Sequence, residues 1–98
     1  MPTQSLIEPP KAALTRRVGS NCDCVGSDVV WVKASLCLLG RYHAPFGLSP
    51  VADRGLFDAI MAYQRDRGLV VDGHADPLGE TESTLRVEIP RVLQGAKA

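Results

Sequence analysis

Two cysteines and two histidines are the side chains of this sequence that could bind a metal ion together. Cys22 and Cys24 flank a single residue, and His43 and His74 lie in separate segments. Thiolates and imidazoles suit zinc, but structural zinc sites typically have about two to four residues between paired cysteines. Because one intervening residue strains simultaneous tetrahedral ligation, we predict no metal site and no cofactor.

Residues 72–76 bring carboxylates and an imidazole close together in sequence. Asp72, His74 and Asp76 supply an acid–base pair, but a covalent mechanism also needs a nucleophile held against its base. No such nucleophile accompanies this segment. Asp72 and Asp76 are also too local to suggest the two facing carboxylates of a glycoside hydrolase. We therefore predict that the chain is not an enzyme.

The chain contains three cysteines, Cys22, Cys24 and Cys37. An odd number cannot be fully paired within one chain, and a ring between Cys22 and Cys24 would be tight. Two interpretations stay open. All three thiols are reduced, as in a cytosolic monomer, or they form intermolecular disulfides in an assembled particle.

An apolar segment over residues 29–39 predicts the first helix. Ser27 is the predicted N-cap, and Asp28 lies in the first turn, where the helix dipole favours negative charge. Gly40 is the expected left-handed terminator. Residues at helical spacing form one core stripe, which consists of Val29, Val32, Leu36 and Leu39.

Further apolar residues flank this stripe. Val30 and Cys37 fall on one side of it, whereas Trp31 and Leu38 fall on the other. A helix that is apolar nearly all round is buried on more than one side. We therefore expect Val30, Trp31 and Leu38 to form an interface with a protein partner.

Ser49 and Pro50 predict the start of a second helix over about residues 50–67, although Gly55 would allow a start nearer Leu56. Gly68 should end this helix. Its core stripe consists of Leu56, Ala59, Ile60 and Tyr63.

The segment after the second helix is expected to be a short extended piece followed by a turn at Asp72 and Gly73. Thr81 can cap a last short helix that carries Leu85. Pro90 should stop that helix near residue 89, because proline lacks the N–H that the helix needs.

Composition limits the classes of function. A chain of 98 residues supports one domain, and a hydrophobic content of 45% is ordinary for a globular fold. Eleven basic and eleven acidic side chains cancel, so no net field attracts nucleic acid. No apolar run approaches the ~18 residues of a membrane span, and the N-terminus lacks the features of a secretory signal. We expect neither a nucleic acid nor a membrane as partner.

In order and spacing, these elements resemble the small three-helix peptidoglycan-binding module found beside bacterial and phage cell-wall hydrolases. The resemblance spans roughly residues 18–85. It rests on Asp28, Val29, Val32, Leu36, Leu39, Gly40, Ala59, Ile60, Tyr63, Gln64, Leu69, Val71, Asp72, Gly73, Pro77, Gly79, Thr81 and Leu85. It implies a mainly α fold: a compact three-helix peptidoglycan-binding-like domain over residues 18–88, with irregular arms over residues 1–17 and 89–98.

The resemblance also implies a noncatalytic module with a shallow groove for peptidoglycan. The loop residues expected to supply stacking and hydrogen bonds are Tyr42, His43, Phe46, Asp72 and His74. Two features depart from the family's pattern near this groove. Lys33 stands where the family commonly has glutamine, and residues 43–48 replace the usual Asp-Gly pair.

We expect the module to be a structural or cell-wall-attachment component of a phage-like virion, with other protein subunits as partners. Its expected location is then the virion or the cytoplasm of the producing bacterium. The alternative is a cytosolically made targeting or accessory subunit of a cell-wall lytic enzyme, which binds the wall without assembling into a particle.

Overall fold

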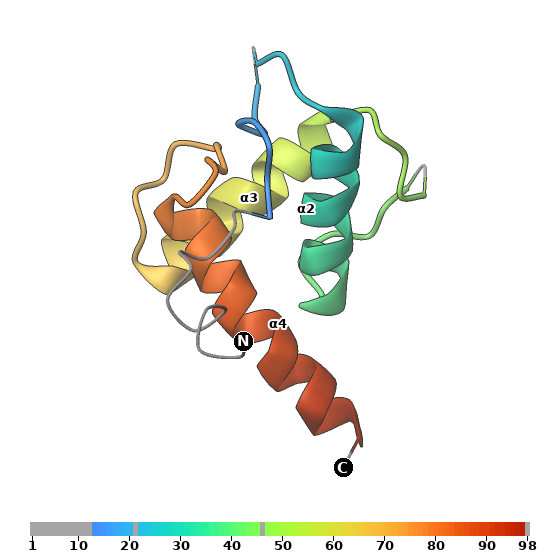
Figure 1. The fold of residues 1–98 in the computed structure, drawn as a ribbon, viewed down its shortest axis with the longest axis vertical. Coiled ribbons are helices and arrows are strands. Elements are labelled where there is room, and N and C mark those ends of the chain that lie inside the picture. Colours follow the sequence, from blue (N-terminus) through green and yellow to red (C-terminus); the bar gives the residue numbers. More distant parts are fainter. Residues whose placement is uncertain (1–12, 21, 46, 98) are drawn as a thin grey trace, which may run out of the picture.

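The protein is described by a computed structural model, which covers residues 13–20, 22–45 and 47–97. Three helices make up the fold: α2 (Gly26–Leu38), α3 (Arg54–Arg67) and α4 (Glu80–Lys97). Helix α2 packs against both α3 and α4, and the C-terminal half of α4 projects away from the other two helices (Figure 1). The described residues contain no strand, only isolated bridges. The expected mainly α, three-helix fold is confirmed.

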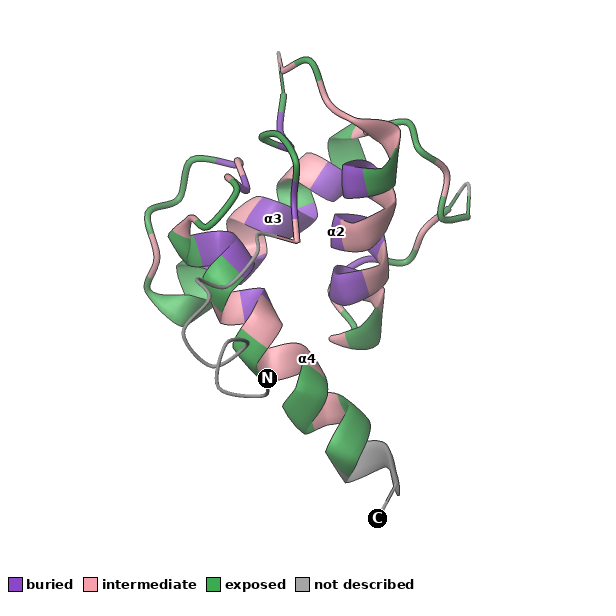
Figure 2. Ribbon diagram, viewed as in Figure 1, coloured by how far each residue is buried: buried purple, intermediate pink, exposed green. Residues whose placement is uncertain are grey.

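The core lies where the three helices face one another (Figure 2). The predicted stripe of α3 is buried throughout, and that of α2 is buried except for the half-buried Leu39. Helix α4 adds Leu85, and the connecting segments add four more side chains. The buried apolar residues are Leu14, Val18, Val29, Val32, Leu36, Tyr42, Leu56, Ala59, Ile60, Tyr63, Ala75 and Leu85.

Helix α2 begins two residues before its predicted start. Its N-cap is Val25, which makes no side-chain capping bond, so the prediction of Ser27 as N-cap was wrong. Tertiary packing fixes this start instead, because a Cβ atom on Gly26 would lie only 2.8 Å from Cβ of Pro50. Glycine alone permits that close approach.

The predicted terminator of α2 is confirmed. Gly40 has a φ of +70°, and its N–H donates to the carbonyl of Cys37 at 3.0 Å. The N–H of Arg41 donates to the carbonyl of Leu36 at 2.8 Å. These two bonds form a Schellman motif, which satisfies carbonyls at the helix end that would otherwise lack partners. Gly68 ends α3 in the same way, with a φ of +71°.

Helix α3 begins at Arg54 rather than at Pro50, so the predicted cap at Ser49 was wrong. Asp53 is the N-cap, and its Oδ1 accepts a hydrogen bond from the N–H of Leu56 at 2.8 Å. The hydroxyl of Ser49 instead accepts a hydrogen bond from Lys33 Nζ at 3.1 Å. A tertiary contact therefore uses the group that the sequence pattern assigned to capping.

Helix α4 continues through Pro90 to Lys97, so the predicted stop near residue 89 was wrong, and residues 89–97 are helical rather than irregular. Proline removes the hydrogen bond that its own N–H would give to the carbonyl of Arg86. It leaves the donors of the following residues intact. Arg91, Leu93 and Gln94, which come after it, are good helix formers.

Charged side chains join α3 to α4 beside the core. Arg67 donates to both oxygens of Glu88, with Nε–Oε2 and Nη2–Oε1 distances of 2.8 and 2.6 Å. The hydroxyl of Tyr63 also donates to Glu88. The Arg67 guanidinium, followed by the Tyr63 hydroxyl, holds the pKa of the Glu88 carboxyl below its usual value despite partial burial.

The described part of the predicted N-terminal arm, residues 13–17, is irregular but attached to the domain. Leu14 is buried, and the backbone N–H groups of Thr15 and Arg16 donate to the carboxylate of Asp28 at 2.9 to 3.1 Å. Residues 1–12 lie outside the described residues. The domain division at residue 18 stays a prediction, although Leu14 already belongs to the core.

None of the helices in the described part of the chain has the length and apolar character needed to cross a membrane.

Candidate functional site

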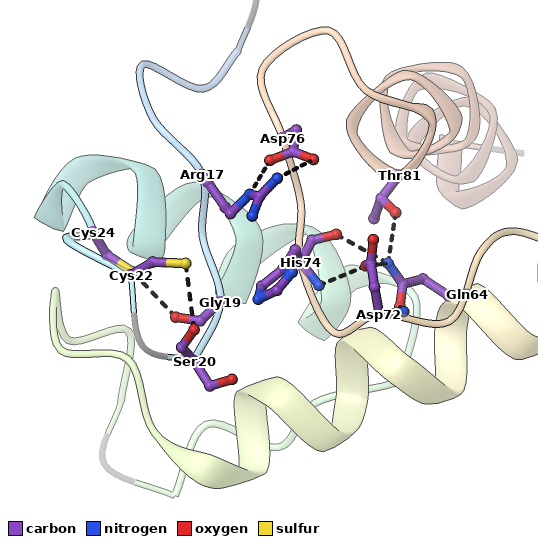
Figure 3. A network of polar contacts seen from close by, with 10 residues as sticks. All are labelled: Arg17, Gly19, Ser20, Cys22, Cys24, Gln64, Asp72, His74, Asp76 and Thr81. Carbon is purple, nitrogen blue, oxygen red and sulfur yellow. Dashed lines mark hydrogen bonds and ion pairs between the residues drawn. The ribbon is translucent and has the colours of Figure 1, made fainter.

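The first part of the loop between α3 and α4 is held in place by the buried side chain of Gln64, which is 1% exposed. Its Oε1 accepts hydrogen bonds from the backbone N–H groups of Asp72 at 3.1 Å and Gly73 at 3.0 Å. Its Nε2 lies 2.9 Å from Asp72 Oδ1, 2.9 Å from the carbonyl of His74 and 3.0 Å from Thr81 Oγ1 (Figure 3). The amide has two protons for these three acceptors, so one proton is shared. The path of residues 72–74 is thereby fixed.

This anchoring leaves two polar side chains at the loop surface. Asp72 is exposed and His74 is half-buried. The backbone N–H of His74, at 2.9 Å, lowers the pKa of the Asp72 carboxyl; burial opposes this shift, and the Gln64 amide adds to it. Asp72 therefore presents a negative charge at neutral pH.

The same loop is fastened to the segment that precedes α2. Val18 and Ala75 exchange backbone hydrogen bonds of 2.9 and 2.8 Å, and Arg17 forms an ion pair with Asp76. The ring of His74 lies directly on Gly19, since a Cβ atom added there would be 2.1 Å from His74 Cδ2. Gly19 therefore fixes the position of the imidazole.

Tyr42 and His43 belong to the other connecting segment, between α2 and α3. Figure 1 shows most of this segment on the opposite side of the molecule from the α3–α4 loop. Tyr42 is 5% exposed, and its hydroxyl donates to Asp53 Oδ2 at 2.6 Å. Burial, followed by this hydrogen bond to Asp53, raises the pKa of Tyr42 to about 12. His43 is exposed, and Phe46 lies outside the described residues. Of the four predicted ligand residues that the structure describes, Asp72 and His74 thus lie in one loop, and Tyr42 and His43 lie in the other.

Lys33 holds the first loop much as Gln64 holds the second. Its side chain is fully buried, and Nζ donates to the carbonyl of Val51 at 2.6 Å and lies 3.2 Å from Asp53 Oδ2. Sequence reasoning identified Lys33 only as a departure from the family's pattern near the groove and missed this role. The available signal was its place on a helix that is apolar nearly all round.

A family model described as "Putative peptidoglycan binding domain" matches residues 25–78. The match takes in α2, α3 and the loop that Gln64 organises, and it covers more than half of the chain. The chain belongs to the peptidoglycan-binding domain family. The resemblance expected from the sequence is thereby confirmed, and the chain is a binding module. No curated protein and no solved structure matches it.

The three cysteines of this peptidoglycan-binding domain are free thiols, and all three are half-buried. Cys22 Sγ donates to the carbonyl of Ser20 at 3.4 Å, and Cys24 Sγ donates to that of Gly19 at 3.5 Å. Cys37 packs against the edge of the core. The predicted intermolecular disulfides stay a prediction. In the ranges that the structure covers, no group of three or more histidine, cysteine or acidic side chains could hold a metal ion.

The predicted partner face on α2 is unevenly exposed. Val30 and Trp31 are half-buried, and Trp31 packs partly against the core. Leu38, in the last turn, is 47% exposed. Their role in an interface stays a prediction.

Proposed function

We propose that this peptidoglycan-binding domain is a noncatalytic module that contacts the cell wall through its α3–α4 loop, with Asp72 and His74 as contact residues. The observation that carries the proposal is the bonding of Gln64 to the backbone of residues 72–74, which leaves the Asp72 carboxylate exposed. A loop fixed before binding loses little conformational entropy when a ligand arrives. Carboxylate and imidazole groups suit the hydroxyl, amide and amine groups of a glycopeptide.

The residues of the other loop have different parts in this proposal. The exposed His43 keeps its predicted contact role, as does Phe46. Tyr42 contributes indirectly, because its hydroxyl bond to Asp53 supports the loop that carries His43.

The test is a pull-down of the full chain on purified cell-wall sacculi. We compare the unmodified protein with the double variant Asp72→Asn, His74→Ala. Asparagine keeps the Oδ1 acceptor for the N–H of His74 and for Gln64, and alanine keeps the backbone groups at position 74, so the loop should keep its path. We expect the unmodified protein to sediment with the sacculi and the double variant to stay largely in solution.

Asp58→Asn is the matched control, because Asp58 is an exposed carboxylate on α3, outside the loop. This variant should bind like the unmodified protein. Wall binding is refuted if the folded, unmodified protein does not sediment. Equal binding by the double variant would move the contact surface away from residues 72–74.

We further propose that the module is a structural or attachment subunit of a phage-like particle, with Val30, Trp31 and Leu38 of α2 against a neighbouring protein. The exposed fraction of Leu38 and the half-buried Val30 and Trp31 support this, since apolar side chains left at a surface often mark interfaces. In the native source, the protein should then co-sediment with particles, and Leu38→Glu should abolish this. Co-purification with a lytic enzyme instead would favour an accessory subunit.

A further inference from the structure

The thiols of Cys22 and Cys24 converge on one short turn. They donate to the carbonyls of consecutive residues, Cys24 to Gly19 and Cys22 to Ser20. Figure 3 shows both sulfur atoms on the same side of this turn. Each thiol is therefore within hydrogen-bonding distance of one of two consecutive carbonyls of this turn.

This turn is also the surface on which His74 rests. A Cβ atom on Gly19 would lie 2.1 Å from Cδ2 of the His74 ring, so the ring contacts the turn directly. Arg17, two residues before Gly19, is ion-paired with Asp76 of the α3–α4 loop. The two thiols therefore belong to the same polar cluster as the α3–α4 loop.

We propose that Cys22 and Cys24 form a redox-active dithiol that closes to an intramolecular disulfide, and that His74 senses its state. Two residues of chain span at most about 7 Å, and disulfides need Cα atoms roughly 4.4 to 6.8 Å apart. The ring can therefore close, but with strain, which makes a disulfide easier to reduce. Cys37 lies in α2, outside this turn, and is not part of the dithiol.

The reaction is a thiol–disulfide exchange with a low-molecular-weight disulfide such as oxidised glutathione. One cysteine thiolate attacks a glutathione sulfur, which gives a mixed disulfide and releases one glutathione thiolate. The second cysteine thiolate then attacks the protein sulfur of the mixed disulfide and releases the other glutathione. The protein gives up two electrons and two protons, and one oxidised glutathione becomes two reduced ones.

Closing the ring removes both S–H donors, so the carbonyls of Gly19 and Ser20 lose the hydrogen bonds that they now accept. The turn must adjust, and the ring of His74 in contact with Gly19 must adjust with it. Oxidation is thereby communicated to the loop that carries Asp72. This inference concerns thiol chemistry and the environment of His74, and it does not depend on wall binding.

The test is to equilibrate the full native chain with reduced and oxidised glutathione, and then to count free thiols and measure its mass. We expect the free thiols to fall from three to one per chain, with a loss of two hydrogens and no added glutathione. The imidazole NMR signals of His74 should shift. Those of His43, the other of the two histidines, should not, because it lies in the opposite loop.

Variants separate this dithiol from other thiol chemistry. In the variant Cys37→Ser, the number of free thiols per chain should fall from two to none, and the His74 signals should still shift. Cys22→Ser and Cys24→Ser keep a hydroxyl donor in the turn but should each take up glutathione instead of closing a ring, without the closure-linked shift. Three unreacted thiols, stable glutathione adducts on the unmodified chain, or disulfide-linked dimers would each overturn the proposal. So would ring closure that leaves the His74 signals unchanged.

Discussion

The carboxylate of Glu82 accepts a hydrogen bond from the backbone N–H of Leu14 at 2.8 Å, across 68 positions of sequence. Glu82 is fully buried in the first turn of α4. Its second oxygen accepts a hydrogen bond from the N–H of Leu78 at 3.2 Å and lies 3.6 Å from Arg86. Together with Asp28, Glu82 makes the segment before α2 part of the folded domain.

Replacement of Glu82 by glutamine should lower the free energy of unfolding by about 1–3 kcal/mol. Glutamine offers one carbonyl oxygen, so either the buried N–H of Leu14 or the partly buried N–H of Leu78 loses its acceptor. Urea denaturation measures the change. The control is Glu80→Gln in the same turn, where the side chain is exposed and the expected change is within about 0.5 kcal/mol. Equal losses in the two variants would contradict the assigned role of Glu82.

The variant Lys33→Met should destabilise the protein by about 3 kcal/mol, near the low end for a broken buried ion pair. Methionine fills a similar volume but leaves Asp53, whose side chain is 21% exposed, without its cation. Chemical denaturation of both proteins tests this. In the double variant Lys33→Met, Asp53→Asn, much of the loss should be recovered. If the double variant is no more stable than Lys33→Met, the ion pair is not the source of the effect.

Acid should destabilise the protein only at low pH. Hydrogen bonds and cations lower the native-state pKa values of Asp53, Asp72 and Glu88. A carboxyl with a lowered native pKa stabilises the fold above its unfolded pKa, and this contribution is lost as the pH falls through the native value. The urea midpoint should therefore be nearly constant from neutral pH to about pH 5 and fall below about pH 4. Asp72→Asn and Glu88→Gln should each make that fall less steep, and an unchanged slope would exclude them as its cause.

High pH should destabilise the protein through ionisation of its buried tyrosine hydroxyls. Tyr42 has a native pKa of about 12, against an ordinary value of 10.0. A group whose pKa is raised on folding stabilises the native state fully below the unfolded pKa, so this contribution is lost as the pH rises from about 10 to 12. When tyrosinate is followed by its ultraviolet absorbance, the native protein should ionise at a higher pH than the protein in denaturant. If the native and the denatured protein ionised over the same pH range, the assigned burial of the Tyr42 hydroxyl would be contradicted.

Gly19→Ala should destabilise the fold by about 1–3 kcal/mol, because its Cβ atom would overlap the ring of His74. Thermal or urea unfolding gives the size of the effect. In a His74→Ala background the same substitution should cost less, since the overlapping ring is gone, and the difference measures the coupling of the two positions. A cost that is equal in both backgrounds would refute direct contact.

The bodies and C-terminal ends of α2 and α3 could be predicted because their signals are local, whereas the end of α4 could not. Apolar spacing located the buried faces of α2 and α3, and Gly40 and Gly68 end these helices through bonds within a single turn. The helix starts could not be predicted in the same way. Pro50 packs against Gly26, and the hydroxyl of Ser49 accepts a hydrogen bond from Lys33. Residues that were expected to start a helix therefore make contacts between distant segments instead.

The candidate site could be predicted only in part. The turn at Asp72 and Gly73 was predicted from its own residues, but its attachment to Gln64 was not. The burial of Tyr42 and Lys33 depends on their meeting at Asp53, which no single segment specifies. The capture of the N-terminal segment by Glu82 depends on the same kind of long-range pairing. Sequence patterns predicted the positions of these polar groups but not their partners.

The way in which Gln64 holds its loop has a consequence for how such a surface can evolve. Most of its bonds go to main-chain atoms of residues 72–74 rather than to their side chains. Side chains of this loop can therefore be exchanged with little effect on its backbone path. A lineage, or a designed library, could change which ligand the loop recognises while the scaffold beneath it keeps its geometry.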